Sequence, residues 1–458
     1  MIKFGNRVEL MVDRYLIDKM GGCTFRGEAL KDEGKIISFT EPWECFGSST
    51  STAFDDNGTV KLYYRGYPDK TTGLTELEEN QVSCLAESAD GIHFVKKPVN
   101  EIDYFGIKEN NIVSMGMHCH NFAPFLDKNP NCKPEEKYKS ICGHFKKGVE
   151  TFASPDGIHW KKTSDDYVIT KGFFDTTNIA FFDTVAGKYR CFTRTFLDRQ
   201  RNIVDVNDRC DIPGAWMRII QSSESTDFKN WSEPVPHDYG AHKQFEHLYT
   251  NATTPIPGAE HILAAFPMRF HAQRKKVYEF NGNPQGSNGI SDMVFMTSRD
   301  GQHWDRTIRE GYLSGNLDET EWTQRNFIAS SGIISRDDKF IIYVQKHYMW
   351  EDHGIWAYSV PRYRFSAIEA GYDGGILETN DLEFENDDFY INYSTSAYGS
   401  IVIKAVDEFG NFIAKTDEIY GNELSHKVHF EGLKGRHGRL IIEMNDAKLY
   451  AIGADMSK

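Results

Sequence analysis

The sequence predicts an all-β fold, with a five-bladed β-propeller over residues 1–365 and a C-terminal antiparallel β-sandwich over residues 366–458. Three observations lead to this prediction. One turn motif recurs four times at nearly constant spacing, the segments between its copies have the pattern of short strands, and the character of the sequence changes near Ser366. Aromatic residues make up 13% of the chain, and aromatic side chains fit pleated sheet surfaces.

The repeated motif has the pattern Ser-x-Asp-(Gly)-x-x-aromatic. Its four copies are Glu87-Ser-Ala-Asp-Gly-Ile-His-Phe94, Ala153-Ser-Pro-Asp-Gly-Ile-His-Trp160, Glu224-Ser-Thr-Asp-Phe-Lys-Asn-Trp231 and Thr297-Ser-Arg-Asp-Gly-Gln-His-Trp304. Successive serines are 66, 71 and 73 residues apart. Asp-Gly supplies the positive-φ positions of a tight turn, and Ser and Asp side chains bond to turn backbone groups. We therefore expect Asp90, Asp156, Asp227 and Asp300 to be structural.

Each copy of the motif closes a unit of four predicted strands. In the first unit these are Ser48-Ser-Thr-Ser-Thr-Ala-Phe54, Val60-Lys-Leu-Tyr-Tyr-Arg65, Val82-Ser-Cys-Leu-Ala-Glu87 and a strand that begins at Phe94. Later units begin at Asn121, at Asn178 and near Tyr249, and a fifth unit without the motif runs from Asn326 to Phe365. Five four-stranded units of about 70 residues are typical of a five-bladed propeller.

The chain after residue 366 contains short segments with the alternating pattern of exposed strands. They are Leu382-Glu-Phe, Phe389-Tyr-Ile-Asn-Tyr393, Ser400-Ile-Val-Ile-Lys-Ala-Val406, Lys427-Val-His-Phe430, Arg439-Leu-Ile-Ile-Glu-Met444 and Leu449-Tyr-Ala-Ile452. Turn sequences such as Glu408-Phe-Gly-Asn411 separate them. This pattern predicts an antiparallel sandwich, and no segment of the chain predicts a long helix.

Composition excludes several classes of function. The net charge of −15 argues against a nucleic-acid partner, which requires a basic face. With 40% hydrophobic residues the chain can form a packed core, but no apolar run approaches the roughly 20 residues of a membrane helix. The beginning of the sequence lacks the apolar region of a secretory signal, so we expect a cytoplasmic protein. No feature of the sequence predicts an oligomeric state.

The eight cysteines all precede residue 211 and form no Cys-x-x-Cys pair. Zinc ribbons and thioredoxin-type redox sites therefore have no support, and a disulfide framework is not expected in a long chain without an export signal. We expect free thiols, and neither a cofactor nor a bound metal.

Several segments resemble the fructosidase and arabinanase type of glycoside hydrolases, families 32 and 43, and more closely a bacterial group within their superfamily. They are Leu10-Met-Val-Asp-Arg-Tyr-Leu-Ile17, the Asp-Gly-Ile-His-Trp motifs, Glu246-His-Leu-Tyr-Thr-Asn-Ala-Thr-Thr-Pro255 and Phe389-Tyr-Ile-Asn-Tyr-Ser-Thr-Ser-Ala397. The resemblance spans nearly the whole chain. It implies a propeller with an appended sandwich that acts on an oligosaccharide.

The chain also departs from that resemblance. The Asn-Asp-Pro-Asn and Arg-Asp-Pro motifs of invertase-like enzymes are absent, and the one Glu-Cys pair, Glu44-Cys45, lies in the first unit. Sialidases share the Ser-x-Asp-x-Gly turn, but they also need three arginines that bind the substrate carboxylate. We identify no such set of arginines at the predicted inner strands.

Candidate site residues are those just before or on the inner strands, because these strands line the channel of a propeller. The set comprises Asp13, Trp43, Glu44, His118, His120, Asn121, Asp175, Asn178, Glu246, His247, Tyr249, Glu321, Trp322, Arg325 and Asn326. Asp13 is expected on a strand that closes the ring. The others contribute polar or aromatic groups from each of the five units.

Glycoside hydrolysis usually needs two carboxyl groups, one that donates a proton and one that attacks or activates water. The preferred pair is Asp175 as nucleophile or base and Glu246 as acid, with Phe245 and Tyr249 desolvating Glu246. Glu44, Asp13 and Glu321 are further candidates. Asp175 and Glu246 could each instead cap a turn or pair with Arg325.

The remaining candidates would bind the sugar. His118 and His120 would point the same way on a strand, and with His247 they could hydrogen-bond to hydroxyl groups, hold a metal or have a structural role. Asn121, Asn178, Tyr249 and Asn326 join this polar set, Arg325 could bind hydroxyl groups or a carboxylate, and Trp43 and Trp322 could stack on a sugar ring or pack in the core.

The function predicted from these residues is a glycoside hydrolase that uses a carboxylate pair in the propeller channel. Two alternatives stay open: a polysaccharide lyase or glycoside phosphorylase on the same fold, and a carbohydrate-binding protein without activity. A fold by itself does not choose among them.

Overall fold

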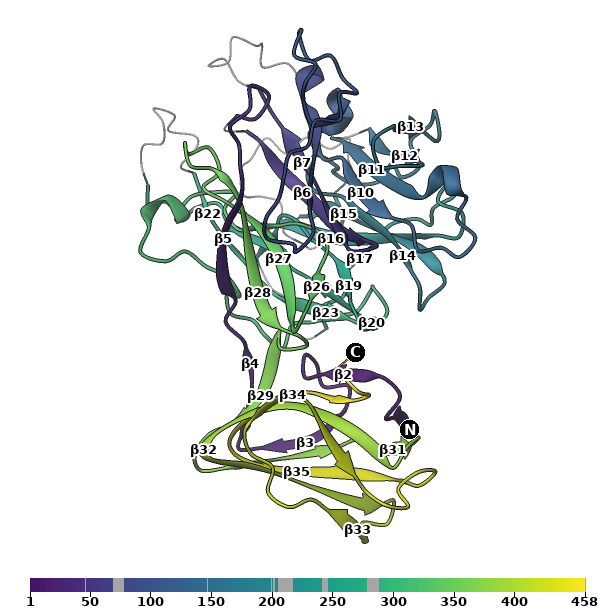
Figure 1. Ribbon diagram of the computed structural model, residues 1–458, viewed down its shortest axis with the longest axis vertical. Helices are drawn as coiled ribbons and strands as arrows, with labels where there is room; N and C mark the ends of the chain where they lie inside the picture. The colour runs from purple at the N-terminus through teal and green to yellow at the C-terminus, as the bar shows by residue number, and fades with distance from the viewer. Residues whose placement is uncertain are drawn as a thin grey trace.

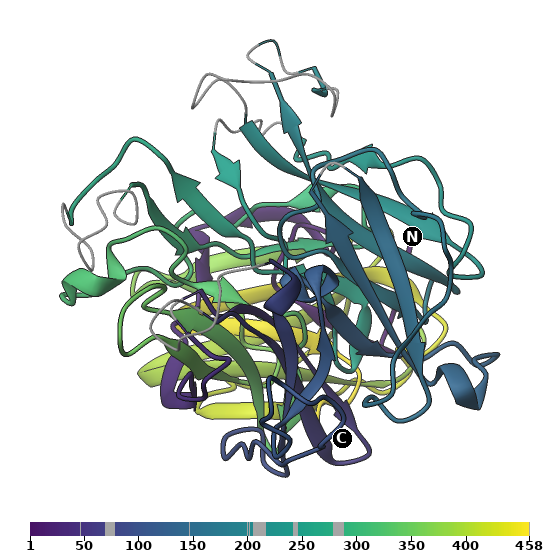
Figure 2. The ribbon, with the colours of Figure 1, turned by 90° about the horizontal axis from the view of Figure 1, so that it is seen from above.

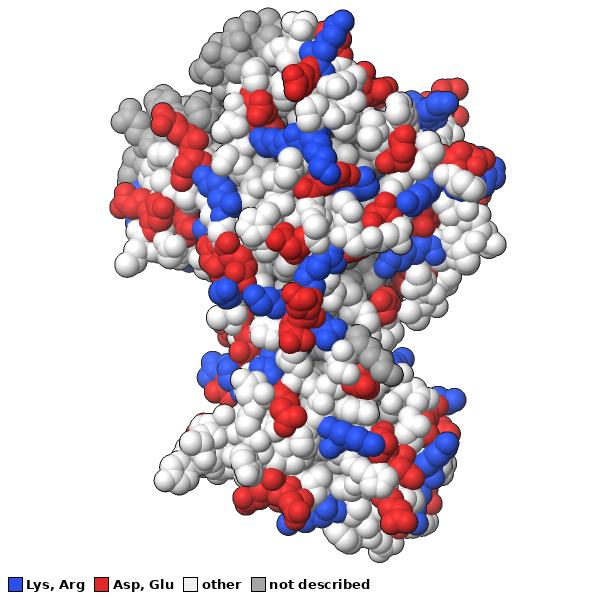
Figure 3. Space-filling model, viewed as in Figure 1, with Lys and Arg blue, Asp and Glu red and all other residues white. Residues whose placement is uncertain are grey.

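The computed structural model describes residues 1–45, 47–68, 78–145, 147–198, 200, 202–204, 217–240, 246–277 and 288–457. These residues form an all-β structure, as predicted, and its short helical parts are 3-10 turns. Two lobes follow one another along the long axis (Figure 1). We call residues 31–361 the ring lobe, and residues 2–27 with 366–453 the terminal lobe. Acidic and basic side chains intersperse over both lobes on the face in Figure 3.

The ring lobe consists of antiparallel sheets, and the first three are each formed by consecutive strands of the chain. The first sheet has β6 (Ser49–Asp56), β7 (Thr59–Gly66), β8 (Val82–Ser88) and β9 (Ile112–Met115); the second has β10 (Ala123–Leu126), β11 (Tyr138–His144), β12 (Gly148–Ser154) and β13 (Lys161–Lys162). The third has β14 (Ile179–Asp183), β15 (Lys188–Leu197), β16 (Met217–Ser225) and β17 (Val235–Pro236).

The later sheets of the ring lobe depart from this regular order. The fourth has β19 (Thr254–Ile256), β20 (Ala259–Ala265), β23 (Met296–Ser298) and β24 (Trp304–Asp305), beside a short sheet of β18 (His247–Leu248), β21 (Met268–His271) and β22 (Ile290–Met293). The fifth has β25 (Ile328–Ala329), β26 (Ile334–Arg336), β27 (Lys339–Lys346) and β28 (Gly354–Pro361), and its outer strand is β5 (Lys31–Ser38). The prediction that residues 326–365 complete the fifth unit by themselves is therefore wrong.

The first and fifth sheets lie next to each other, so the sheets close into a ring. The Ala53 N–H donates to the Ser331 carbonyl at 2.8 Å, and the side chains of Ser51 and Ser330 bond to each other. A cavity of about 290 Å³ is lined by residues on or next to β6, β10, β14 and β19, such as Phe54, Phe125, Phe181 and Pro255, and by Ser331, Gly332, Ile333 and Ser335, which follow β25. Figure 2 views this arrangement from above.

The repeated turns join neighbouring sheets, which confirms their structural role. In the second copy, Asp156 Oδ1 accepts from the N–H groups of Ile158 and His159 at 2.8 and 2.9 Å. The buried Tyr63 of the first sheet donates its hydroxyl to Gly157 of this turn at 2.9 Å. In the same way Tyr343 of the fifth sheet donates to Gly91 of the first turn at 2.8 Å.

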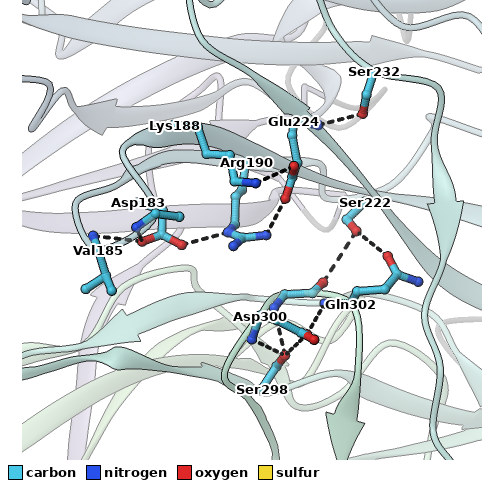
Figure 4. A network of polar contacts seen from close by, with 12 residues as sticks. Asp183, Val185, Lys188, Arg190, Ser222, Glu224, Ser232, Ser298, Asp300 and Gln302 are labelled. Carbon is cyan, nitrogen blue, oxygen red and sulfur yellow. Dashed lines mark hydrogen bonds and ion pairs between the residues drawn. The ribbon is translucent and has the colours of Figure 1, made fainter.

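Figure 4 shows the fourth turn packed against the third sheet. Ser222 donates its hydroxyl to the Gly301 carbonyl at 3.4 Å and contacts the Gln302 side chain at 3.3 Å. Nearby, the buried Arg190 pairs with Asp183 and Glu224, each at 2.7 Å, within the third sheet. These polar contacts fix the junction between the third and fourth sheets.

The terminal lobe takes strands from both ends of the chain. It contains β1 (Ile2–Phe4), β2 (Val8–Leu10), β3 (Ile17–Gly21), β4 (Cys23–Gly27), β29 (Ser366–Ala370), β30 (Gly375–Thr379), β31 (Leu382–Phe384), β32 (Asp388–Asp407), β33 (Phe412–Lys415), β34 (Asn422–His429) and β35 (His437–Gly453). β4 pairs with β29, β3 with β30, and β1 runs parallel to β31. The prediction that residues 1–27 belong to the propeller was therefore wrong.

Two long strands organise the terminal lobe. β32 and β35 pair along nearly their whole length, with register shifts between Asn392 and Tyr393 and between Thr395 and Ser400. Each had been predicted as two short strands, because the bulge residues between them interrupt the alternating pattern. The strands enclose a core that includes Leu382, Phe389 and Ile442.

Other expectations can be compared with the described residues. Within them, no helix is long and apolar enough to cross a membrane. Seven cysteines are free thiols, as predicted, and five of these are buried. The eighth, Cys210, lies outside the described residues.

Candidate functional site

The candidate site lies where the first strands of the ring sheets begin. It is built around four arginines, Arg65 on β7, Arg194 on β15, Arg218 on β16 and Arg325 before β25, which we call the arginine cluster. Only Arg325 was among the residues selected from the sequence. The other three lie on second or third strands, so the expectation that the inner strands carry no set of three arginines is unaffected.

Tyr249 connects three members of the arginine cluster. The guanidinium carbons of Arg194 and Arg218 lie 5.2 and 4.8 Å from its ring centroid, and Arg325 hydrogen-bonds to it. Arg194 and Arg218 also lie 5.1 and 5.3 Å from the ring of Phe196. These contacts place the three guanidinium groups around one phenol.

The fourth member, Arg65, joins the cluster through the first and second sheets. Its Nη1 donates to the carbonyl of His120 at 2.9 Å, and its Nη2 donates to the carbonyl of Gly47 at 2.6 Å. Burial lowers the pKa of Arg65, and its further electrostatic neighbours include Tyr348, Arg325 and Tyr249. Arg325 in turn donates to the Tyr348 hydroxyl at 2.8 Å.

Asp175 is the one carboxylate that pairs with the arginine cluster among the described residues. Arg194 Nη2 donates to its Oδ1. The Asp175 side chain is 37% exposed, whereas that of Arg194 is 4% exposed. The carboxylate therefore faces solvent from a setting of buried guanidinium groups.

Several donors of the cluster are buried and have no hydrogen-bond partner among the described residues. They are Nε and Nη1 of Arg194, Nε of Arg65 and Nε of Arg218. Buried polar groups nearly always have partners, and an unpaired buried charge is costly. The cluster is therefore electrostatically incomplete without a further acceptor.

The phenol of Tyr249 is tuned by this surplus of positive charge. Burial by itself would raise the pKa of Tyr249, but nearby guanidinium groups outweigh burial and lower the pKa. They belong, in order of effect, to Arg325, Arg194 and Arg218. A phenol with a lowered pKa is a better proton donor than an ordinary tyrosine.

The histidines predicted to act together lie in separate sets of contacts. His118 and His120 belong to the 3-10 turn Met117–His120, not to a strand. His118 bonds to Ser114 at 2.6 Å and stacks on Phe152, whereas His120 lies 3.2 Å from Arg65. Burial, and for His120 also Arg65, lowers the pKa of His118 to about 4 and that of His120 to about 3.

His247 contacts Arg218 at 3.3 Å. Burial and then the charge of Arg218 lower its pKa to about 4. His120 lies beside Arg65 and His247 lies beside Arg218, so both positions are unfavourable for a metal cation. The alternative that these histidines bind a metal therefore loses its support. The three imidazoles are neutral at pH 7.

Asn121 and Asn178 hold the loop that carries Asp175. Asn121 Nδ2 donates to the carbonyls of Gly143 and Phe174, each at 2.9 Å, and its Oδ1 accepts from the Gly143 N–H at 2.6 Å. Asn178 Nδ2 also donates to the Phe174 carbonyl at 2.9 Å. Both side chains are almost fully buried, so we interpret them as positioning residues instead of sugar ligands.

Asn326 is buried and bonds to Thr323 at 2.6 Å and Thr320 at 3.0 Å, and therefore holds its own loop. Asn251, which the sequence analysis did not select, donates to the Thr177 carbonyl at 3.2 Å. An asparagine at the start of successive units is a repeat that could have been recognised in the sequence.

Glu246 lies in a different ion-pair network from Asp175. Arg306 pairs with its Oε1, and Arg269 lies 3.4 Å from its Oε2. With both oxygens beside guanidinium groups, the geometry gives no support to Glu246 as the proton donor. Phe245, expected to desolvate it, lies outside the described residues.

Two other candidate carboxylates have structural contacts. Glu44 is buried and accepts from the Tyr64 hydroxyl at 2.6 Å and from Lys96 at 2.5 Å. Asp13 lies in the terminal lobe between β2 and β3, where it pairs with Arg299 at 2.7 Å. Asp13 therefore links the two lobes and does not close the ring as expected.

The last three candidates also lie in local networks. Glu321 is buried and pairs with Lys346 at 2.8 Å. Trp43 is buried and packs edge-on against Tyr104 at 6.0 Å, so core packing is its role. The indole N–H of Trp322 donates to the Asn316 carbonyl at 2.7 Å.

Comparison with known proteins gives similarities of fold. No family model matches the sequence, and no curated protein matches it. The structure is similar to solved glycoside hydrolases, one of them titled simply glycoside hydrolase, with 12% identity, a TM-score of 0.47, and coverage of 73% of this chain and 92% of that one.

Two further solved structures cover more of the chain. An arabinoxylan arabinofuranohydrolase of glycoside hydrolase family 43 from Bacillus subtilis is 9% identical, with a TM-score of 0.38 and coverage of 90% of this chain and 96% of that one. A fructofuranosidase from Schwanniomyces occidentalis is 10% identical, with a TM-score of 0.40 and coverage of 93% and 98%. The similarity anticipated from sequence is thus found.

Proposed function

We propose that this chain is a five-bladed propeller with an appended β-sandwich, and that it hydrolyses a glycosidic bond of an oligosaccharide at the arginine cluster. The observation that carries the proposal is the half-exposed Asp175, held by the buried Arg194 beside Tyr249. A carboxylate and a tuned proton donor together supply the two roles of glycoside hydrolysis.

In the proposed reaction, Asp175 attacks the anomeric carbon or removes a proton from the attacking water. The hydroxyl of Tyr249 donates its proton to the glycosidic oxygen as the bond to the leaving sugar breaks. If Asp175 attacks, a water then cleaves the bond between Asp175 and the sugar, supplies the hydroxyl of the new reducing end and returns its proton to the tyrosinate. If Asp175 acts as base, the water has already supplied that hydroxyl, and the proton held by Asp175 returns to the tyrosinate through solvent. Arg194 orients Asp175, since its Nη2 donates to Asp175 Oδ1. A cytoplasmic location stays a prediction.

The test compares three substitutions with wild type on a panel of p-nitrophenyl glycosides and on oligosaccharides, with reducing ends measured. Asp175→Asn and Tyr249→Phe should each lower kcat by about 10²–10⁴-fold, the usual contribution of a positioned acid or base. Glu246→Gln should stay within about tenfold of wild type, because Glu246 belongs to another network. The melting temperature of each variant shows that it is folded.

The outcomes separate the possible functions. Wild-type rates in both Asp175→Asn and Tyr249→Phe would overturn the proposed roles, and a large loss confined to Glu246→Gln would restore Glu246 as the acid. A product that absorbs in the ultraviolet indicates a lyase, and turnover that requires phosphate indicates a phosphorylase. Sugar binding without any turnover indicates a carbohydrate-binding protein.

A further inference from the structure

The arginine cluster holds more positive charge than its protein partners balance. Four guanidinium groups meet around Tyr249 and Tyr348, and Asp175 is the one carboxylate paired with them in the described ranges. A neutral sugar needs hydrogen-bond donors and acceptors in similar number, whereas this site consists largely of donors.

The burial of the cluster makes this surplus informative. Arg194 and Arg65 are 3% and 8% exposed, and each keeps a buried nitrogen without a partner in the part of the chain that the structure describes. Surface arginines complete their hydrogen bonds with water, whereas these nitrogens have no acceptor among the described residues. An anionic group that enters beside Asp175 would supply both the missing acceptors and the missing charge.

We propose that the arginine cluster binds the carboxylate of an acidic sugar, so that the substrate is a glycoside of a sugar acid. This inference rests on the proposed function only in calling the sugar acid a substrate, because binding of the carboxylate does not depend on hydrolysis. Guanidinium groups suit this ligand because their planar donor pairs match the two oxygens of a carboxylate.

Two observations favour a sugar carboxylate over inorganic phosphate. The anion must share the site with Asp175, and like charges repel, so a monoanion is accommodated better than a group that carries up to two charges at neutral pH. Aromatic rings also flank the arginines: Phe196 and Phe270 are partly exposed, and Arg218 lies 5.3 and 5.6 Å from their centroids. Such rings can pack against a sugar but offer nothing to phosphate.

The test measures ligand binding by isothermal titration calorimetry on the full chain, separately from any turnover. The probes are sodium D-glucuronate and sodium D-galacturonate, with D-glucose and D-galactose as their neutral counterparts and sodium phosphate as the competing anion. At least one sugar acid should bind ten or more times tighter than its neutral counterpart and than phosphate.

Substitutions then assign the binding to the cluster. Arg194→Met and Arg218→Met should each weaken binding of that sugar acid by tenfold or more, while binding of neutral sugars changes less than threefold. Arg436→Met is the matched control, because Arg436 is exposed in the terminal lobe and donates to the Gly432 carbonyl. If Arg194→Met unfolds, Arg218→Met decides, since Arg218 lies beside His247 and forms no ion pair with Asp175 among the described residues.

Equal binding of acidic and neutral sugars, or phosphate binding tighter than either sugar acid, would overturn this inference. So would a preference for sugar acids that survives both substitutions. Binding of a sugar acid through the arginines without hydrolysis keeps the inference and removes the proposed function. Hydrolysis of neutral glycosides without a preference for sugar acids keeps the proposed function and overturns this inference.

Discussion

Replacement of Gly143 by alanine tests whether the loop that carries Asp175 is held as tightly as the structure indicates. Gly143 lies on β11, and a Cβ added there would meet the carbonyl oxygen of Phe174 at 2.5 Å and would also press against Asn178. The obstacle is backbone, and the same carbonyl accepts hydrogen bonds from Asn121 and Asn178. The loop must therefore move for the methyl group to fit.

The expected cost follows from these contacts. An overpacked site costs about 1–3 kcal/mol, and weakening of the hydrogen bonds at the Phe174 carbonyl adds about 1 kcal/mol. We expect Gly143→Ala to lower the free energy of unfolding by about 3 kcal/mol. With about 2.1 cal/mol/K of unfolding entropy per residue over roughly 330 residues of the ring lobe, this corresponds to about 4 °C in Tm.

The assay combines a thermal melt with turnover. Because Phe174 precedes Asp175, the displaced loop should also lower kcat, whereas KM changes less if the arginines stay in place. Gly371→Ala is the matched control, since Gly371 has no neighbour within 4 Å of an added Cβ and no positive φ. A Gly143→Ala variant with the Tm and kcat of wild type would refute the rigid link between this network and Asp175.

Two predictions concern pH. Burial would raise the pKa of Asp156, but backbone and side-chain hydrogen bonds outweigh it and lower the pKa to about 2. The ionised Asp156 therefore contributes its full stabilisation above its unfolded pKa of about 3.9. This stabilisation is lost as the pH falls through about 2. Asp156→Ala should therefore cost about 1–2 kcal/mol in urea unfolding at pH 7 and progressively less below pH 4, whereas a constant difference would contradict the turn geometry. The lowered pKa of Tyr249 predicts that activity falls on the alkaline side below pH 10, and that Arg194→Met, which removes a guanidinium, moves this fall to higher pH. If the fall stays at the same pH in Arg194→Met, another group titrates. The same conclusion follows if the absorbance titration of tyrosinate is identical in wild type and Tyr249→Phe.

Local patterns were enough to predict the repeated turns. Each one is determined by a Ser, an Asp and a positive-φ position within a few residues, and the structure has the same hydrogen bonds at Asp90, Asp156, Asp227 and Asp300. The strands that lead into them were found for the same reason. The bulged strands β32 and β35 were each divided in two, because a bulge interrupts the alternation on which such a prediction depends.

Contacts between distant segments could not be read in this way. β5 completes the fifth sheet although about 300 residues separate it from β28, and β1–β4 pair with strands after residue 365. The sequence of a short edge strand does not indicate which strand it pairs with. The same limit affected Asp13, whose partner Arg299 belongs to the fourth turn.

The sequence by itself determined the all-β class, the repeated units and the position of Asp175, Tyr249 and Arg325 at the start of inner strands. Tertiary structure alone decided which charges meet. Arg65, Arg194 and Arg218 lie on second and third strands, where the sequence gives no sign that they point to one centre, and ring closure brings them around Tyr249. Periodicity is a local property of the chain, whereas the electrostatics of a site depends on distances between segments that only the closed ring defines.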